Sequence, residues 1–280
     1  MGDYGRGASS LETQALTTPS LAATEPDEMS VLVTGFGPFK TNLVNASYLI
    51  ASSLPSSFTF SASTPGSTPC RVSIHVHPSP IPVAYSTVRT TLPVILDDYA
   101  KAHDGRRPDF VIHMGIAATR NYYSVETQAH RDAYLMSDVK DRSGYEDGER
   151  LWRELGLPAV LTAGRASASV PGSGLSSSRS SSAKKYLNPH PPDTEFLTTW
   201  QSFARPGMDL RISNDAGRYL CEFIFYTSLS LAYREGQDRN VVFFHVPGSC
   251  TDEDVAAGKE AAIALIKALV TSWVVSDSQV

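Results

Sequence analysis

Short apolar runs alternate with segments of helical periodicity from about residue 30 onward. Runs of β-branched residues or apolar–polar alternation predict strands, and apolar positions three and four residues apart predict helices. Strands are expected at 31–34, 72–78, 109–115, 208–212 and 240–247, and helices near 45–51, at 82–102, at 194–200, after 217 and around 263–273. This order predicts a single three-layer α/β/α domain with a mostly parallel, mixed central sheet.

Two segments lack this pattern. Residues 1–29 are rich in Ser, Thr, Gly, Ala and acidic residues, so they bury too little apolar surface to offset the entropy of ordering. They are predicted to be a disordered tail, which leaves residues 30–280 for the domain. A Ser- and Pro-rich range at about 156–192 is predicted to be a low-complexity insertion within the domain.

Composition and charge narrow the class of protein. The 280 residues are 41% hydrophobic and 19% charged, with a formal net charge of −5, which is ordinary for a soluble protein. Basic residues are scattered singly or in pairs, so no nucleic-acid partner is expected. The chain shows neither the run of roughly 20 apolar residues that a bilayer span needs nor a signal-peptide pattern. A cytoplasmic protein without a membrane partner is predicted.

The three cysteines, Cys70, Cys221 and Cys250, form no CxxC pair, so neither a disulfide framework nor a zinc site is indicated. One free, reactive thiol is the more natural interpretation. Cys221 is the best candidate for this thiol, because it lies close to a predicted strand-to-helix turn.

The start of that helix decides the chemistry of Cys221. If Asn214 or Asp215 caps the helix, the cysteine lies in the second turn and gains little from the helix dipole. If residues 213–217 form a tight turn instead, the helix begins near Arg218 or Tyr219 and the thiol meets unpaired backbone N–H groups. The second arrangement is favoured, and it predicts a stabilised thiolate.

Two loops of small residues follow predicted strands, at the edge where open α/β sheets bind ligands. The first contains Phe36 and Phe39 among glycines and a proline. These rings either cap the core or line a pocket, and composition favours neither. The second loop spans residues 115–119.

Two further residues complete a possible catalytic set. His245 lies near the end of a buried strand, and Glu126 follows the second loop. With Cys221 they have the composition of a nucleophile, a general base and an orienting acid. Each also has an ordinary interpretation: a buried core thiol, a core histidine and a solvated surface glutamate.

Three motifs resemble the pyroglutamyl-peptidase I family, also called pyrrolidone-carboxylate peptidases. Residues 35–39 with Asn45-Ala46-Ser47 are similar to the family's opening signature. Residues 213–223, with 226–229 behind them, resemble its nucleophile motif in the animal-type rather than the bacterial form, and 244–247 is similar to its histidine motif. Glutamate, cysteine and histidine also occur in the family's order.

The resemblance implies an α/β/α cysteine peptidase that uses neither metal nor organic cofactor. Such an exopeptidase, or omega-peptidase, hydrolyses the bond after an N-terminal 5-oxoproline in small pyroglutamyl peptides, through a thioester acyl-enzyme. By position, Cys221 would be the nucleophile, His245 the base and then the acid, and Glu126 the residue that holds the imidazole. The N–H of the cysteine would contribute to the oxyanion hole.

The resemblance also implies a substrate site. Phe36 and Phe39 would be its aromatic walls, and Tyr219 and Leu220 are expected to contact the substrate beside them. An apolar slot suits this substrate, because a pyroglutamyl residue has no free α-amine to solvate.

The chain also departs from the family. Bacterial members carry an oxyanion-assisting arginine shortly after the glutamate, where this chain has Met136; animal-type sequences lack it too, and Arg131 is a candidate substitute. The tail and the insertion have no counterpart in the family core. Two alternatives therefore stay open: a non-catalytic relative that binds peptides or proteins, and a cysteine hydrolase of a related cyclic amide. The sequence does not decide the oligomeric state.

Overall fold

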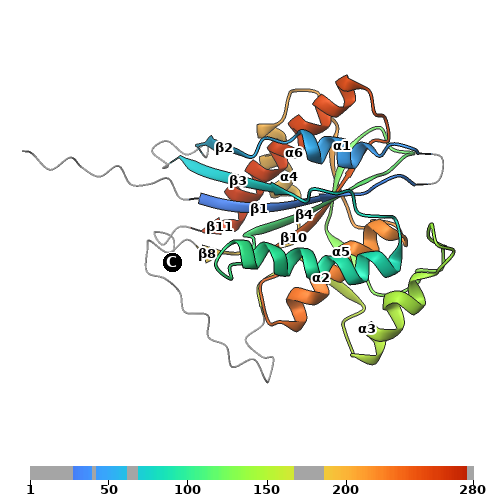
Figure 1. Cartoon of the computed structure of the whole chain (residues 1–280). Helices are drawn as coiled ribbons and strands as arrows, with labels where there is room; N and C mark the ends of the chain where they lie inside the picture. Colours follow the sequence, from blue (N-terminus) through green and yellow to red (C-terminus); the bar gives the residue numbers. More distant parts are fainter. Residues whose placement is uncertain (1–27, 40–41, 62–68, 167–185, 276–280) are drawn as a thin grey trace, which may run out of the picture.

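The computed structural model describes residues 28–39, 42–61, 69–166 and 186–275, and a seven-stranded sheet lies at its centre (Figure 1). The strand order is β2-β3-β1-β4-β10-β5-β9. The strands are β1 (Glu28–Gly35), β2 (Ser57–Phe60), β3 (Cys70–Val76), β4 (Phe110–Ile116), β5 (Tyr123–Glu126), β9 (Leu210–Ser213) and β10 (Val241–Val246). Strands β3, β1, β4 and β10 are parallel, and β2, β5 and β9 run the other way. The mostly parallel, mixed sheet is confirmed.

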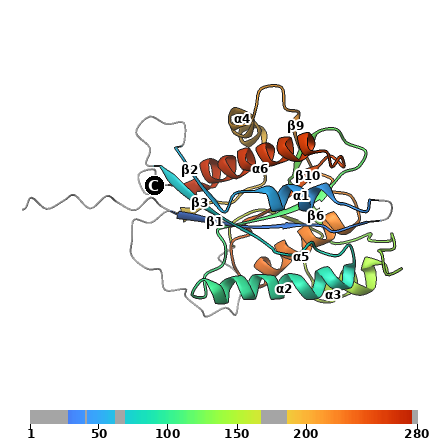
Figure 2. The same ribbon diagram turned by 45° about the horizontal axis from the view of Figure 1, so that its top comes forward.

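Helices cover both faces of the sheet, which confirms the three-layer fold (Figure 2). One face carries α1 (Ala46–Ser53), α4 (Thr194–Phe203) and α6 (Asp252–Trp273). The other carries α2 (Tyr85–Ala102), α3 (Arg150–Glu154), which follows a π-helical turn η1 (Tyr145–Glu149), and α5 (Leu220–Arg234). None of the helices in the described ranges is both long and apolar enough to span a bilayer.

The central strands are apolar on both sides because both sides are covered. Side chains alternate between the two faces of a strand, so Val31 packs into the core under α1, α4 and α6, and its neighbour Leu32 packs into the core under α2 and α5. Phe244 and Phe243 of β10 divide in the same way. This explains why the sequence shows near-continuous apolar runs instead of alternation at these strands.

The limits of the two predicted low-complexity segments need correction. Strand β1 begins at Glu28, so the predicted tail of residues 1–29 extends too far by its last two residues; residues 1–27 lie outside the described part. The range 156–192 is also too wide. Strand β7 (Val160–Thr162) pairs with β6 (Gln128–His130), and β8 (Tyr186–Leu187) pairs with β11 (Val274–Val275), so tertiary pairing orders both flanks. Residues 167–185 lie outside the described part.

Candidate active site

A cavity of about 160 Å³ opens at the carboxyl ends of the parallel strands, where the two predicted loops meet. Its walls include the four residues predicted to bind substrate and the predicted nucleophile: Phe36, Phe39, Tyr219, Leu220 and Cys221. Phe36 is only 3% exposed and also packs in the core, so it combines the two roles that its sequence position left open. The structure thus brings the predicted substrate residues to the predicted nucleophile.

The turn before Cys221 has the geometry favoured from the sequence. Helix α5 begins at Leu220 with Tyr219 as its N-cap, which makes Cys221 the second helical residue. Gly217 has φ of +77°, a conformation that other residues rarely adopt, and its N–H donates to Asp215 Oδ1 at 3.0 Å. A tight turn therefore places the thiol at the helix N-terminus, where backbone N–H groups lack helical partners.

Gly115 makes room for the thiol, a role that sequence reasoning missed. A Cβ atom at Gly115 would lie 2.9 Å from Cys221 Sγ and 2.7 Å from Cζ of Phe243. Both distances are well below van der Waals contact, so a side chain at Gly115 would displace the nucleophile or the ring. In the sequence this glycine marked only the start of a loop; its steric role depends on α5 packing against β4.

Burial outweighs the helix N-terminus in setting the protonation of Cys221. Burial raises the pKa of its thiol to about 12, and the charge of Glu126 acts in the same direction. The Arg120 charge and the backbone N–H of Cys221 itself act against them. These influences favour the protonated thiol, in contrast to the stabilised thiolate expected from the helix start alone.

Glu126 and His245 form a buried pair. The two atoms Glu126 Oε1 and His245 Nδ1 are 2.7 Å apart, and the side chains are 0% and 4% exposed. The strand register produces this contact, because β5 runs antiparallel to β10 with Ser124 opposite His245. Side chains two residues apart share a face, so Glu126 reaches His245 diagonally. A surface role for Glu126 is excluded.

Glu126 is held as a carboxylate. Burial alone would raise its pKa, but the hydrogen bond and charge of His245, together with Ser213 and Arg120, lower the pKa below its ordinary value. The carboxylate fixes the imidazole through Nδ1, and this leaves Nε2 as the ring nitrogen that can exchange a proton.

The strand register also brings His245 toward the thiol. His245 of β10 lies opposite Gly115 of the parallel neighbour β4, and residues in register project from the same face. Cys221 Sγ occupies the space above Gly115 on that face, and the Phe243 ring lies beside the imidazole, with ring centroids 4.7 Å apart. No hydrogen bond joins thiol and imidazole in the described part of the chain. Catalytic hydrogen bonds commonly tighten only when substrate binds.

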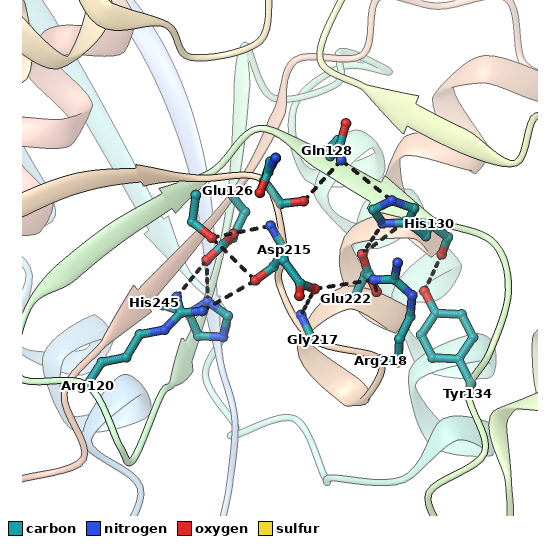
Figure 3. A network of polar contacts seen from close by, with 12 residues as sticks. Arg120, Glu126, Gln128, His130, Tyr134, Asp215, Gly217, Arg218, Glu222 and His245 are labelled. Carbon is teal, nitrogen blue, oxygen red and sulfur yellow. Dashed lines mark hydrogen bonds and ion pairs between the residues drawn. The ribbon is translucent and has the colours of Figure 1, made fainter.

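Arg120 is the site residue that carried no signal in the sequence. Its guanidinium donates through Nη1 to Glu126 Oε1 at 3.2 Å and to Ser124 Oγ at 2.9 Å, and through Nη2 to the carbonyl oxygen of Asp215 at 3.3 Å (Figure 3). Arg120 lies in the loop between β4 and β5, and Glu126 is the last residue of β5, so no sequence pattern links the two. Only the folded chain shows the contact.

The two residues discussed for the missing oxyanion arginine lie elsewhere. Arg131 donates to Asp132 at 2.8 Å and to the Leu157 carbonyl at 2.6 Å, contacts that give it no place at the catalytic pair. Met136 is 51% exposed, and its carbonyl accepts the Tyr85 hydroxyl at 3.0 Å. Arg131 is therefore not the substitute that the sequence suggested.

A second Glu–His pair stabilises the start of α5. Glu222, next to the nucleophile and fully buried, accepts from His130 Nδ1 at 2.6 Å and from Arg218 at 2.6 Å (Figure 3). A carboxylate in the first turn also interacts favourably with the helix dipole. Through His130 the pair ties β6 to the nucleophile helix. Within the described ranges no group of three or more His, Cys, Asp or Glu is placed to hold a metal ion.

Similar proteins were identified by sequence. No family model matches the chain. "Pyroglutamyl-peptidase 1" of Rattus norvegicus is 27% identical over 231 residues, which cover 80% of this chain and 81% of that protein. The Homo sapiens protein of the same name is 26% identical over the same shares of both chains. "Pyrrolidone-carboxylate peptidase" of Pyrococcus furiosus is 26% identical over 219 residues, 78% of this chain and 81% of its own.

Solved structures share the fold. The pyroglutamyl peptidase I of Bacillus amyloliquefaciens superposes with a TM-score of 0.55 at 20% identity, covering 87% of this chain and 96% of its own. A mutant pyrrolidone carboxyl peptidase from P. furiosus has a TM-score of 0.56 at 19% identity, covering 87% and 99%. The mammalian matches agree with the animal-type character of the cysteine motif. The chain is therefore similar over about four-fifths of its length to proteins named pyroglutamyl-peptidase 1 and pyrrolidone-carboxylate peptidase, and it shares the fold of solved structures of such peptidases.

Proposed function

We propose that the protein is a cysteine exopeptidase that hydrolyses the amide bond after an N-terminal pyroglutamyl residue. The observation that carries this proposal is the position of Cys221: the thiol lines an aromatic-walled cavity and lies on the same side of the sheet as the buried Glu126–His245 pair. A nucleophile, a base and an orienting carboxylate at one ligand-sized cavity are the parts that acyl transfer requires.

The cavity walls suit a flat, uncharged lactam. Phe39 and Tyr219 pack with ring centroids 5.2 Å apart, and no Asp, Glu, Lys or Arg is among the described residues that line the cavity. A charged N-terminal amine would lose its hydration there without compensation, so the cavity disfavours ordinary peptides. The amide of Asn45 is already bonded to Gly37 and Ser47, and we propose that Asn42, which also lines the cavity, pairs with the lactam.

The acylation step follows from the state of each group. His245 Nε2 removes the proton of the Cys221 thiol as the sulfur attacks the scissile carbonyl carbon. The oxyanion that forms is stabilised by the N–H of Cys221 at the start of α5; losing one such donor commonly costs about 3 kcal/mol. The C–N bond then breaks, His245 returns its proton to the leaving amine, and the pyroglutamyl group remains on sulfur as a thioester.

Deacylation repeats these roles with water. His245 removes a proton from the water that attacks the thioester carbonyl, and the C–S bond breaks as the thiolate takes that proton back from the imidazolium. The products are free 5-oxoproline and the resting thiol. Glu126 stabilises the imidazolium in both steps, because its carboxylate stays ionised and bonded to Nδ1.

We also propose a cytoplasmic location with small pyroglutamyl peptides as substrates. Cys70, Cys221 and Cys250 are free, as is usual for cysteines in the reducing cytoplasm.

Substrate selectivity tests the proposed function. We expect the purified protein to release a fluorophore from a pyroglutamyl amide and to leave the alanyl amide intact, because only the first lacks a charged α-amine. The prolyl amide is the matched control: it has the same ring size without the lactam carbonyl and with a charged nitrogen. Comparable turnover of prolyl and pyroglutamyl amides would contradict lactam recognition, and absence of turnover would support a non-catalytic relative.

The pH dependence of Cys221 alkylation tests the protonation state of the thiol. Because burial raises its pKa to about 12, the thiolate fraction is small below that pH and grows as pH rises toward it. We expect iodoacetamide to modify Cys221 at pH 7 no faster than free cysteine, with the rate increasing through alkaline pH; mass spectrometry separates Cys221 from Cys70 and Cys250. A rate tenfold above free cysteine at pH 7 would instead show a thiolate–imidazolium pair in the resting protein.

A further inference from the structure

We propose that Arg120 is a positioning residue of this hydrolase, which fixes the Glu126 carboxylate on His245 and ties that pair to the turn that carries Cys221. This role rests on the proposed function of the site. It is assigned from three contacts of one guanidinium: with Glu126, with Ser124 and with the Asp215 carbonyl in the turn before Cys221.

The first contact is with the carboxylate itself. Glu126 Oε1 accepts from Arg120 Nη1 at 3.2 Å, from Ser124 Oγ at 3.3 Å and from His245 Nδ1 at 2.7 Å. Three donors on one oxygen leave the carboxylate little freedom to rotate away from the imidazole. Arg120 also donates to Ser124 Oγ at 2.9 Å, so it holds in place one of the groups that donate to the carboxylate.

The charge of Arg120 matters because Glu126 is fully buried. During the proposed cycle His245 alternates between neutral and protonated forms, so it balances the carboxylate only part of the time. Arg120 is charged at every accessible pH, and its side chain is 24% exposed, so its own charge remains partly hydrated. The fixed cation therefore keeps Glu126 ionised when the imidazole is neutral.

Arg120 is also linked to the turn that carries the nucleophile. Arg120 Nη2 donates to the carbonyl oxygen of Asp215, whose side chain accepts from Gly217 N–H and Arg218 within the tight turn. In Figure 3, Asp215 lies between the Arg120–Glu126–His245 group and the Glu222–His130 group. Because Cys221 follows this turn, Arg120 couples the position of the thiol to that of the imidazole.

Arg120 is itself held by local structure. Its N–H donates to the Ala117 carbonyl at 2.8 Å, which closes a turn directly after β4, and its guanidinium lies 5.7 Å from the centroid of the Tyr122 ring. It does not line the cavity, although Ala118 of the same turn does. A residue with this placement affects the reacting groups and leaves substrate contacts unchanged.

The chain provides a matched control in Arg211. This arginine stacks on the same Tyr122 ring at 3.8 Å and pairs with Asp209 at 2.7 Å, but it has no bond to Glu126, Ser124 or Asp215. Arg211→Met therefore removes an equal charge, together with a closer contact on the same Tyr122 ring, without touching the Glu126–His245 pair.

Steady-state kinetics of the full-length Arg120→Met variant test the proposal. We expect kcat on the pyroglutamyl amide to fall about ten- to hundred-fold, the range that corresponds to hydrogen bonds with charged groups, with KM within about threefold of wild type. Arg211→Met should retain wild-type values. A loss that falls on KM alone would make Arg120 a substrate contact, and an unchanged kcat would overturn the proposal.

The pH profile separates positioning from a merely structural role. The charged groups that face Glu126 are His245 and Arg120, and those acting on Cys221 are Glu126, Arg120 and Glu222. Removing the cation raises the pKa of Glu126 and favours the imidazolium, so the acid limb of kcat/KM should move upward by about half to one pH unit. Arg120→Lys should restore the acid limb to its wild-type position, since the positive charge remains. It should restore only part of kcat, because an ammonium cannot bridge Glu126 and Asp215 as the guanidinium does.

A substrate-free measurement distinguishes failure of this proposal from failure of the proposed function. Alkylation of Cys221 needs no turnover, and the Arg120 charge lowers the pKa of that thiol. We expect iodoacetamide at pH 8 to react severalfold more slowly with Arg120→Met than with wild type or Arg211→Met. If the wild-type protein does not hydrolyse the pyroglutamyl amide but the variants still differ in alkylation rate, the positioning role of Arg120 stands and the proposed peptidase activity is wrong. If Arg120→Met does not fold, the kcat of Arg120→Lys decides: a wild-type kcat there would overturn the bridging role.

Discussion

Cys221→Ala is expected to abolish hydrolysis of the pyroglutamyl amide, with kcat falling by at least about 10⁴-fold. The reason is chemical: the thioester forms on Sγ, and no other described thiol lines the cavity. Alanine removes only the sulfur, which leaves the cavity walls and the Glu126–His245 contact in place. Fluorophore release under saturating substrate measures the effect, with melting temperature as the check on folding.

Cys250→Ala is the matched control for that experiment. Cys250 is a free, half-buried thiol in the loop after β10, and its Sγ donates to the backbone carbonyls of Val44 and Gly248 at 3.9 and 3.7 Å. The Cys250→Ala variant should keep wild-type activity. Residual turnover by Cys221→Ala above a few per cent, in a protein that melts like wild type, would show that the thiol at the helix start is not the nucleophile.

Local patterns were sufficient to predict the architecture and the nucleophile turn. The apolar runs of β1, β4 and β10 are long because both faces are buried, and a glycine before Tyr219 allows the left-handed turn that starts α5. These features depend on residues that are neighbours in the chain. Phe36 and Cys221 each follow a predicted strand near the edge where ligands bind, although the substrate role of Phe36 rested on the family resemblance.

The features that sequence reasoning missed depend on packing between distant segments. Arg120 meets Asp215 only because β5 and β9 are neighbours in the sheet, and Gly115 meets Cys221 only because α5 packs on β4. Burial of Cys221, which raises the pKa of its thiol against the effect of the helix start, likewise comes from tertiary packing. Strand β7, inside a range predicted to be an insertion, forms because β6 supplies a partner.

The second large effect is expected for Glu126→Gln, which should lower kcat by about 10³- to 10⁴-fold with little change in KM. Glutamine keeps the size of the side chain but removes the charge that stabilises the imidazolium, and its NH₂ can turn the imidazole to the tautomer whose Nε2 already carries a proton. The cavity is lined by other residues, so substrate binding should persist.

The direction of the pH shift gives this prediction its sharpest test. Loss of the Glu126 carboxylate disfavours the imidazolium, so the acid limb of kcat/KM should move to lower pH, opposite to the upward shift expected for Arg120→Met. The two residues bond to each other at 3.2 Å, so substitutions that only loosened the local structure would shift both profiles in the same direction or neither. Opposite shifts would therefore show that the pair acts on His245 through charge. Wild-type kcat in Glu126→Gln would remove Glu126 from the catalytic set and leave its buried contact with His245 as a structural one.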